Sequence, residues 1–186
     1  KHKKINNIAT HHEQAAGFSA IAYAQKSNKL GACLVSTGCG STNAITAVLS
    51  AWQDGVPVIF ISGQNILKET SRFTGLKIRT FGQQEADIVS LVQSITKFST
   101  MISDPSEIES VMDKAIELAT SGRKGPVWLD IPVDIQSAQV QFDPKESPLC
   151  TKIRDDRLNP NTDAKTLSQI STGKKENKFG VSEKDF

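Results

Sequence analysis

The chain has 186 residues, enough for one domain with a hydrophobic core and too few for two full domains. Hydrophobic residues make up 38% of it, charged residues 23%, and the net charge is +2, which argues against a nucleic-acid binder that depends on bulk charge. The sequence has no apolar run long enough to predict a membrane span, so we expect a soluble, cytoplasmic protein with no nucleic-acid or membrane partner.

Short apolar runs alternate with longer segments of helical period over most of the chain. In chain order, the patterns predict a strand at 5–10, a helix at 13–27, a strand at 32–36, a helix at 41–53, a strand at 58–62, a helix at 86–93, a strand at 98–102, a helix at 105–120 and a strand at 127–131. Most of these strands are apolar on both faces. The sequence therefore predicts an α/β fold with three layers, α/β/α, around a mostly parallel sheet.

The composition changes after residue 142. From residue 143 onward, 10 of 44 residues are hydrophobic, or 23%. We therefore expect one domain over residues 1–142 and a polar linker or disordered tail over 143–186. The three cysteines and three histidines have no metal-ligand spacing, so we predict no metal site built by this chain alone.

Two predicted connections are candidates for ligand binding. Residues 37–41 (TGCGS) join a strand to a helix, and residues 63–82 form a connection of about 20 residues, which is rare in a compact domain unless it has a function. Both follow the carboxyl end of a strand, where open α/β sheets bind ligands. Gly38 and Gly40 look like the start of a dinucleotide-binding fingerprint, but Asn43 occupies the place of its third glycine, so this interpretation is weak.

Glu13 stands where the first predicted strand meets the first predicted helix. A carboxylate there complements the helix dipole. The same position also directs it toward the ligand crevice at the top of the sheet. The local sequence leaves both interpretations open.

Five motifs together resemble one family: HEQAA at 12–16, TGCGSTNA at 37–44, VPVIFISGQ at 56–64, QEADIV at 84–89 and GPVWLDIP at 125–132. The family is the acetolactate-synthase-like group of thiamine-diphosphate-dependent enzymes. The resemblance is to their N-terminal pyrimidine-binding domain and covers residues 5–142. It also implies that the first strand and helix of that domain are not part of this chain.

The resemblance implies a catalytic role for Glu13. In the family, this glutamate hydrogen-bonds N1′ of the cofactor aminopyrimidine and favours the imino tautomer that removes the proton from thiazolium C2. A carboxyl group suits this role if burial raises its pKa enough to share a proton with a ring nitrogen. We therefore expect a raised pKa for Glu13.

The resemblance also implies roles for the other motifs. Thr37, Gly38, Gly40 and Asn43 would form part of the wall around the aminopyrimidine. Gln84 would reach over the cofactor toward the substrate, with capping of the helix at 86–93 as the alternative. The residue before it is glutamine, where acetolactate synthases carry phenylalanine, so the resemblance leaves the substrate open.

The rest of the implied active site lies in other domains. The family holds the diphosphate and Mg²⁺ through a Gly-Asp-Gly motif, which residues 1–186 lack, and FAD accompanies the cofactor in some members. The resemblance implies a 2-keto acid substrate such as pyruvate and a homo-oligomer, a dimer or tetramer, whose active site lies between subunits. The isolated chain would then have no appreciable turnover. The alternative is a non-catalytic binding or interaction module that needs a partner chain or is a degenerate remnant.

Overall fold

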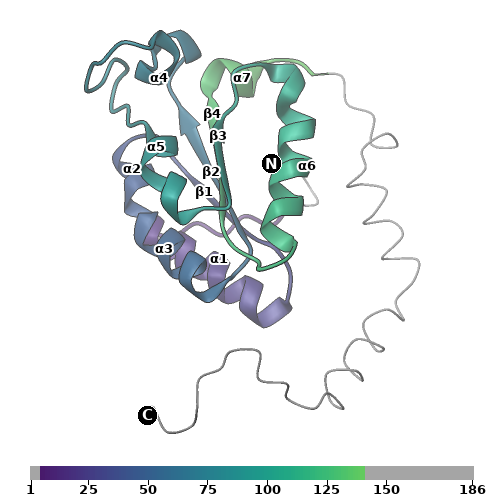
Figure 1. The fold of residues 1–186 in the computed structure, drawn as a ribbon. Coiled ribbons are helices and arrows are strands. Elements are labelled where there is room, and N and C mark those ends of the chain that lie inside the picture. Colours follow the sequence, from purple (N-terminus) through teal and green to yellow (C-terminus); the bar gives the residue numbers. More distant parts are fainter. Residues whose placement is uncertain (1–4, 141–186) are drawn as a thin grey trace, which may run out of the picture. The chain divides into compact units, whose positions relative to one another are not determined.

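One four-stranded sheet organises the protein, whose structure is a computed structural model that describes residues 5–140. Its strands are β1 (Gly31–Val35), β2 (Val58–Gln64), β3 (Phe98–Met101) and β4 (Val127–Pro132). They lie in the order β1-β2-β4-β3, and every neighbouring pair is parallel (Figure 1). Parallel neighbours need crossover connections, which the helices between them supply.

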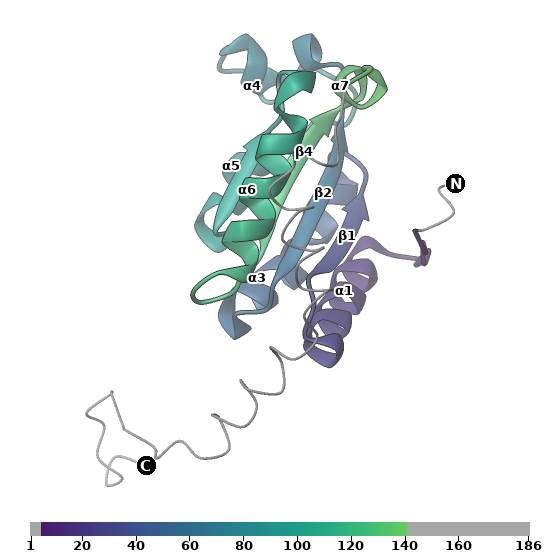
Figure 2. The same ribbon diagram turned by 90° about the vertical axis from the view of Figure 1, so that its right-hand side faces the viewer.

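Helices cover both faces of the sheet. The α-helices are α1 (Glu13–Ser27), α2 (Cys39–Asn43), α3 (Ile45–Asp54), α4 (Ser71–Thr74), α5 (Ile88–Val92), α6 (Ile108–Thr120) and α7 (Val133–Ser137). Helices α1, α3 and α5 lie on one face, whereas α6 lies on the other (Figures 1 and 2). The chain moves one way along the sheet from β1 to β3 and then reverses to β4. Because crossovers are right-handed, this reversal places α6 on the opposite face. The predicted three-layer α/β/α class is confirmed.

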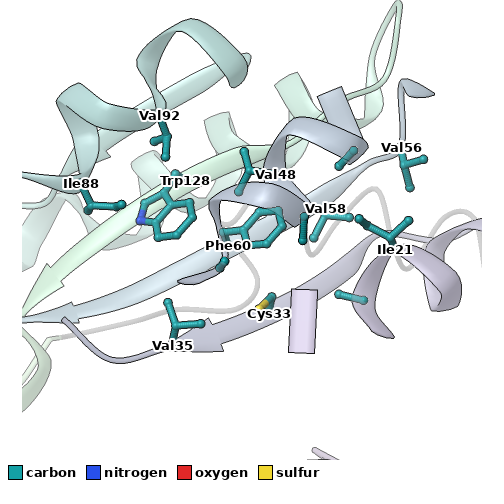
Figure 3. Packing of buried hydrophobic residues seen from close by; sticks show 14 of the residues in the cluster. Ile21, Cys33, Val35, Val48, Val56, Val58, Phe60, Ile88, Val92 and Trp128 are labelled. Carbon is teal, nitrogen blue, oxygen red and sulfur yellow. The ribbon is translucent and has the colours of Figure 1, made fainter. Parts of the chain in front are cut away.

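The larger hydrophobic core lies between the sheet and helices α1, α3 and α5. Its centre is a stacked pair, Phe60 of β2 and Trp128 of β4, whose ring centroids are 5.4 Å apart and whose planes differ by 4° (Figure 3). Both side chains are fully buried, as is Val48 of α3, which faces them. Trp128 is therefore a core residue, as its position in a predicted strand indicates.

A second, smaller core lies beneath α6. Its buried members are Ile59, Ala115, Ala119, Val127 and Leu129. Alternate residues of β2 and β4 therefore enter the two cores, as expected for strands covered on both faces.

The predicted strand at 5–10 is wrong. These residues have no regular secondary structure, and Ile5 and Ile8 are 67% and 85% exposed. A short apolar run becomes a strand only when a neighbour satisfies its backbone groups, and no strand of the described part of the chain pairs with it. Trp52, which its helical pattern places in the core, is 39% exposed on the outer side of α3.

Several predicted helices differ from the observed ones in their limits. The helix predicted at 41–53 is two helices, α2 and α3, which meet at Ala44. The helix predicted at 86–93 is shortened to α5, and the one at 105–120 begins with a 3₁₀ turn that Asp104 caps through Ser106 N. Helices α4 and α7 are additions that the sequence did not predict. Within residues 5–140, no helix has the length and apolar character needed to span a membrane. The predicted tail at 143–186 lies outside the described residues.

No helix within residues 5–140 covers one face of β1. Cys33 and Val35 point into the larger core, whereas Leu34, on the other face, is 72% exposed. Helix α6 contacts β2, β3 and β4, which leaves the edge strand covered on one side only among the described residues.

Two leucines of the sheet test this difference in burial. We expect Leu129→Ala, which empties a fully buried site in β4, to lower the free energy of unfolding by about 2–5 kcal/mol. The matched change in β1, Leu34→Ala, removes an exposed side chain and should cost about 0.5 kcal/mol or less. Urea unfolding followed by circular dichroism measures both. Equal losses would mean that the open face of β1 is covered in solution.

Candidate functional site

Glu13 begins helix α1 and faces the turn that follows β1. The helix starts here because His12 is its N-cap, with Nδ1 accepting a hydrogen bond from Gln14 N at 3.1 Å. The Glu13 carboxylate accepts a hydrogen bond from Asn43 Nδ2 at 3.0 Å. Glu13 is therefore both a first-turn carboxylate and a partner of a residue 30 positions away.

The turn at 37–41 needs its two glycines for different reasons. Gly38 has φ 63° and ψ −123°, and a Cβ there would overlap the carbonyl oxygen of Gln84. At Gly40, a Cβ would overlap Ser36 Oγ and lie 3.3 Å from Glu13 Oε1. Because Gly38 and Gly40 have no side chains, the turn lies close to Gln84 on one side and to Glu13 on the other.

Gln84 lies against the turn through its backbone. Its φ is 57°, unusual for a residue other than glycine, and its side chain is exposed. Capping of the following helix is not its role, because Asp87 caps α5 by accepting a hydrogen bond from Ser90 N. This leaves the Gln84 side chain on the surface next to Gly38.

The predicted site residues thus form two groups joined by one turn. Glu13, Gly40 and Asn43 surround one carboxylate, whereas Gly38 contacts the Gln84 segment. The Thr37 hydroxyl faces the interior, where it donates a hydrogen bond to Gln64 Oε1 at 2.6 Å.

The expected raised pKa of Glu13 is wrong for this chain. The hydrogen bond from Asn43 is the main cause that lowers the pKa of this carboxyl, and the Glu13 backbone and the nearby His12 act in the same direction. Burial acts to raise the pKa, but Glu13 is only partly buried, so this effect is the smaller one. Glu13 is ionised at neutral pH.

A hollow of about 480 Å³ lies beside Glu13. Its walls are the segment 7–13, Ala16 of α1, and Leu34, Val35 and Ser36 at the end of β1. The exposed face of Leu34 thus contributes apolar surface next to the Glu13 carboxylate. A carboxylate beside an apolar wall suits a flat, partly polar ligand.

A buried glutamate shapes the long connection at 63–82. Glu85 accepts hydrogen bonds from Ser71 N and Oγ at 2.5 and 2.6 Å, and from Phe81 N at 2.7 Å. Burial acts to raise the pKa of Glu85, but these hydrogen bonds outweigh it and the pKa is lowered. Glu85 therefore links Ser71, near the middle of the connection, to Phe81, near its end. Gln84 follows shortly after this linked segment.

Sequence reasoning missed four polar residues that support this site. They are Ser62, Gln64 and Asp130, buried toward the carboxyl ends of β2 and β4, and Glu85, buried in the loop before α5. The available signal is a polar or acidic residue inside an apolar run, as in VIFISGQ and VWLDIP. Such residues are costly to bury without partners, so they indicate a hydrogen-bonded cluster.

Comparisons with known proteins agree with the motifs. Residues 1–91, which include Glu13, the glycine turn and Gln84, match the family model described as "Thiamine pyrophosphate enzyme, N-terminal TPP binding domain". The acetolactate synthase large subunit of Corynebacterium glutamicum is 37% identical over 139 residues, which cover 75% of this chain and 21% of the relative.

Relatives from other organisms show the same coverage. The acetolactate synthase isozyme 2 large subunit of Escherichia coli is 37% identical over 140 residues, 75% of this chain and 24% of the relative. The chloroplastic acetolactate synthase of Arabidopsis thaliana is 39% identical over 132 residues, 71% of this chain and 18% of the relative. The chain spans about a fifth of the length of these relatives.

Two glycines with nearly equal φ angles test the contact between the turn and Gln84. Gly38 and Gly75 have φ 63° and 66°, but an added Cβ has nothing within 4 Å at Gly75. We expect Gly75→Ala to cost about 1–2 kcal/mol of unfolding free energy from backbone strain alone. Gly38→Ala should cost about 1–3 kcal/mol more, because the methyl group meets the Gln84 carbonyl and because alanine adopts a ψ of −123° at this φ less readily than the ψ of 4° at Gly75. Chemical denaturation measures both variants, and equal costs would contradict the close approach.

Proposed function

Because this chain belongs to the acetolactate-synthase-like thiamine-pyrophosphate enzymes as their N-terminal domain, we propose that it supplies the pyrimidine-binding half of an active site for 2-keto acids. The observation that carries the proposal is the placement of Glu13. Its carboxylate lies at the start of α1, bonded to Asn43 and beside Gly40, at the edge of the sheet where α/β folds bind ligands.

The residues present fit an aminopyrimidine ring. Gly40 has no side chain next to Glu13 Oε1, and the cradle it leaves would be filled by a Cβ. A carboxylate that accepts one hydrogen bond from Asn43 keeps lone pairs for a ring nitrogen. We assign Glu13 to the ring nitrogen, Gly38, Gly40 and Asn43 to the wall, and Gln84 to the substrate side.

Thr37 takes a different part in this proposal. Its hydroxyl donates inward to Gln64, so the residue would support the wall through its main chain rather than donate to the ligand. Bound thiamine diphosphate would supply the electron sink for decarboxylation and carbon–carbon bond formation. The role of this chain is to hold the aminopyrimidine ring and, through Glu13, the proton at the ring nitrogen.

The lowered pKa of Glu13 bears on how the site becomes active. A carboxylate that shares a proton with a ring nitrogen needs a pKa closer to that of the ring, and burial is what raises the pKa of a carboxyl group. We propose that a second subunit covers Glu13 and excludes water from it. The active protein would then be a homo-oligomer, a dimer or tetramer, with the site between subunits.

The remaining parts of the proposal concern groups that other domains would hold. The diphosphate and Mg²⁺ would be bound by a separate domain, because no Gly-Asp-Gly motif occurs in residues 1–186. A pyruvate-type 2-keto acid is the proposed substrate, FAD is a possible second cofactor of the whole protein, and the proposed location is the cytoplasm. We place no metal site on this chain.

Thiamine binding tests the pyrimidine half directly. We expect thiamine to move the backbone amide signals of Glu13, Gly40 and Asn43 in ¹⁵N spectra of the chain, with a Kd on the order of 1 mM, about −4 kcal/mol. Glu13→Gln should weaken binding about fivefold or more, because it removes a charged hydrogen-bond acceptor.

A matched variant and a second ligand serve as controls for this titration. Glu69→Gln, a carboxyl-to-amide change in the long connection at a residue with no assigned role in the site, should leave the affinity unchanged. Thiamine diphosphate with Mg²⁺ should bind little more tightly than thiamine, since the anchor for the diphosphate is missing. Micromolar, stoichiometric binding of thiamine diphosphate would contradict the proposal that this chain supplies only half of the active site.

Turnover distinguishes the catalytic proposal from a non-catalytic module. In a chain that joins residues 1–142 to a central and a diphosphate-binding domain of the family, we expect acetolactate to form from pyruvate. Glu13→Gln should lower kcat about 100- to 10,000-fold, the usual size of a lost acid–base function, and Glu69→Gln should not. A Glu13→Gln protein with undiminished turnover would favour the alternative, in which this chain is a non-catalytic binding or interaction module.

A further inference from the structure

A buried polar cluster lies under the candidate site, at the carboxyl ends of β2 and β4. It consists of Ser62 and Gln64 of β2 and Asp130 of β4, and these three side chains are 0%, 6% and 2% exposed. Ser62 and Asp130 are direct neighbours in the sheet, and Trp128 lies two residues before Asp130 on the same face. The cluster therefore continues the larger hydrophobic core toward the site.

The hydrogen bonds of this cluster have a fixed direction. Trp128 Nε1 donates to Ser62 Oγ at 2.9 Å, and Ser62 Oγ lies 2.5 Å from Asp130 Oδ1. An indole N–H can only donate, so the Ser62 oxygen accepts from it and directs its own proton to Asp130. Asp130 Oδ2 accepts a second hydrogen bond, from Gln64 Nε2 at 3.0 Å.

Every polar atom of the Gln64 side chain has a partner. Its Nε2 donates to Asp130 and to the Ala86 carbonyl at 3.2 Å, whereas its Oε1 accepts from Thr37 Oγ1 at 2.6 Å and from Asn65 N at 2.9 Å. A flipped amide would place its oxygen against a carboxylate and a carbonyl, and its nitrogen against an N–H. The Asp130 carboxylate, the Ala86 carbonyl and the Asn65 N–H thus favour the same orientation of the amide, and Asp130 is the one of the three that can change its charge.

We propose that Asp130 is a positioning residue for the candidate site, which fixes the orientation of the Gln64 amide and thereby the spacing between the Gly38 turn and the Gln84 segment. Gln64 reaches both parts at once. Thr37 directly precedes Gly38, and Ala86 is two residues after Gln84. These are the same two segments that meet where Gly38 approaches the Gln84 carbonyl.

The charge on Asp130 is what makes this arrangement dependent on pH. Burial raises the pKa of Asp130 to about 6, against the hydrogen bonds from Ser62 and Gln64, which lower it. The charged groups that act on it are Asp87 at the start of α5, which raises the pKa, and Arg72 of α4, which lowers it. Because Arg72 and Asp87 carry opposite charges, their effects on the pKa of Asp130 oppose one another. The two residues also pair with each other at 2.9 Å.

The sign of the stability effect follows from the raised pKa. The folded protein binds a proton at Asp130 more tightly than the unfolded chain does. The contribution of this group to stability therefore increases as the pH falls from about 6 toward 4. A protonated Asp130 is a weaker acceptor for Gln64 Nε2, so lower pH stabilises the fold at this position while it weakens one of the contacts that orient the Gln64 amide.

Proton-linked NMR shifts in the full 186-residue chain test the proposal without any ligand. We expect the Trp128 indole signal and the backbone amides of Gly38 and Ala86 to shift with one common midpoint near pH 6. The exposed Trp52 indole and the Gly75 amide serve as matched controls and should not share it. A Trp128 signal that titrates alone, or no titration of Trp128 between pH 4.5 and 8, would overturn the proposal.

Two variants distinguish the protonation of Asp130 from its effect, through Gln64, on the Gly38 turn. Asp130→Asn should remove the common midpoint from all three signals, because the group that titrates is gone. Thr37→Val keeps the charge but removes the donor to Gln64, so Trp128 should still titrate while Gly38 no longer follows it. If Gly38 follows Trp128 in both variants, the coupling does not run through Asp130 and Gln64. The wild-type titration decides the matter even if Asp130→Asn does not fold.

The functional meaning of this coupling rests on the proposed function, but the coupling itself does not. A common midpoint in a chain that binds no thiamine would leave Asp130 as a positioning residue of an unassigned site. Thiamine binding at Glu13 without a common midpoint would support the proposed function and reject the role of Asp130.

Discussion

The parallel direction of all four strands is the constraint on which the rest of the structure depends. It brings the carboxyl ends of β1, β2 and β4 to one edge of the sheet. The turn after β1, the polar end of β2 and Asp130 near the end of β4 therefore meet there, although they lie up to 93 residues apart in the sequence. Backbone groups at this edge leave the sheet ladder, so the edge is where polar side chains find partners and where ligands bind.

Burial of polar groups at this edge is offset by directed hydrogen bonds. Asp130 and Glu85 are both carboxyls in an apolar environment, and each accepts several hydrogen bonds. The balance differs between them: burial wins at Asp130 and raises its pKa, whereas the donors of the long connection win at Glu85 and lower it. Within the described residues, no buried side-chain nitrogen or oxygen lacks a partner, as expected for a rigid polar layer under a site.

The binding residues of the candidate site are partly exposed, whereas the polar side chains that support them are buried. Glu13 is partly exposed and lies beside a hollow with an apolar wall, whereas Gln64 and Asp130 below it are buried. Such an arrangement holds the binding residues in place and leaves their upper side for another surface. It agrees with the proposal that this chain, which spans about a fifth of the length of the relatives it matches, supplies one part of an active site.

Much of the fold and of the site could be predicted from residue patterns. Short apolar runs located β1 to β4, because most of these strands are covered on both faces, and the period of 3.6 residues located α1 and α6, because each helix buries one face. The motifs also singled out Glu13, Gly38, Gly40 and Asn43, which the fold brings to one turn. The strand expected at 5–10 failed because pairing, and not apolar character, makes a strand.

What the sequence by itself determined is the class of fold, because it follows from local patterns of residue type, whereas the residues around the glycine turn were predicted from the resemblance of five motifs to one family. Only the tertiary structure decided the burial of Glu13, and with it the direction of its pKa shift. It alone also revealed the link from Asp130 through Gln64 to Thr37, whose members come from three strand ends. Burial and hydrogen-bond direction depend on which segments meet in space, and no local pattern contains that information.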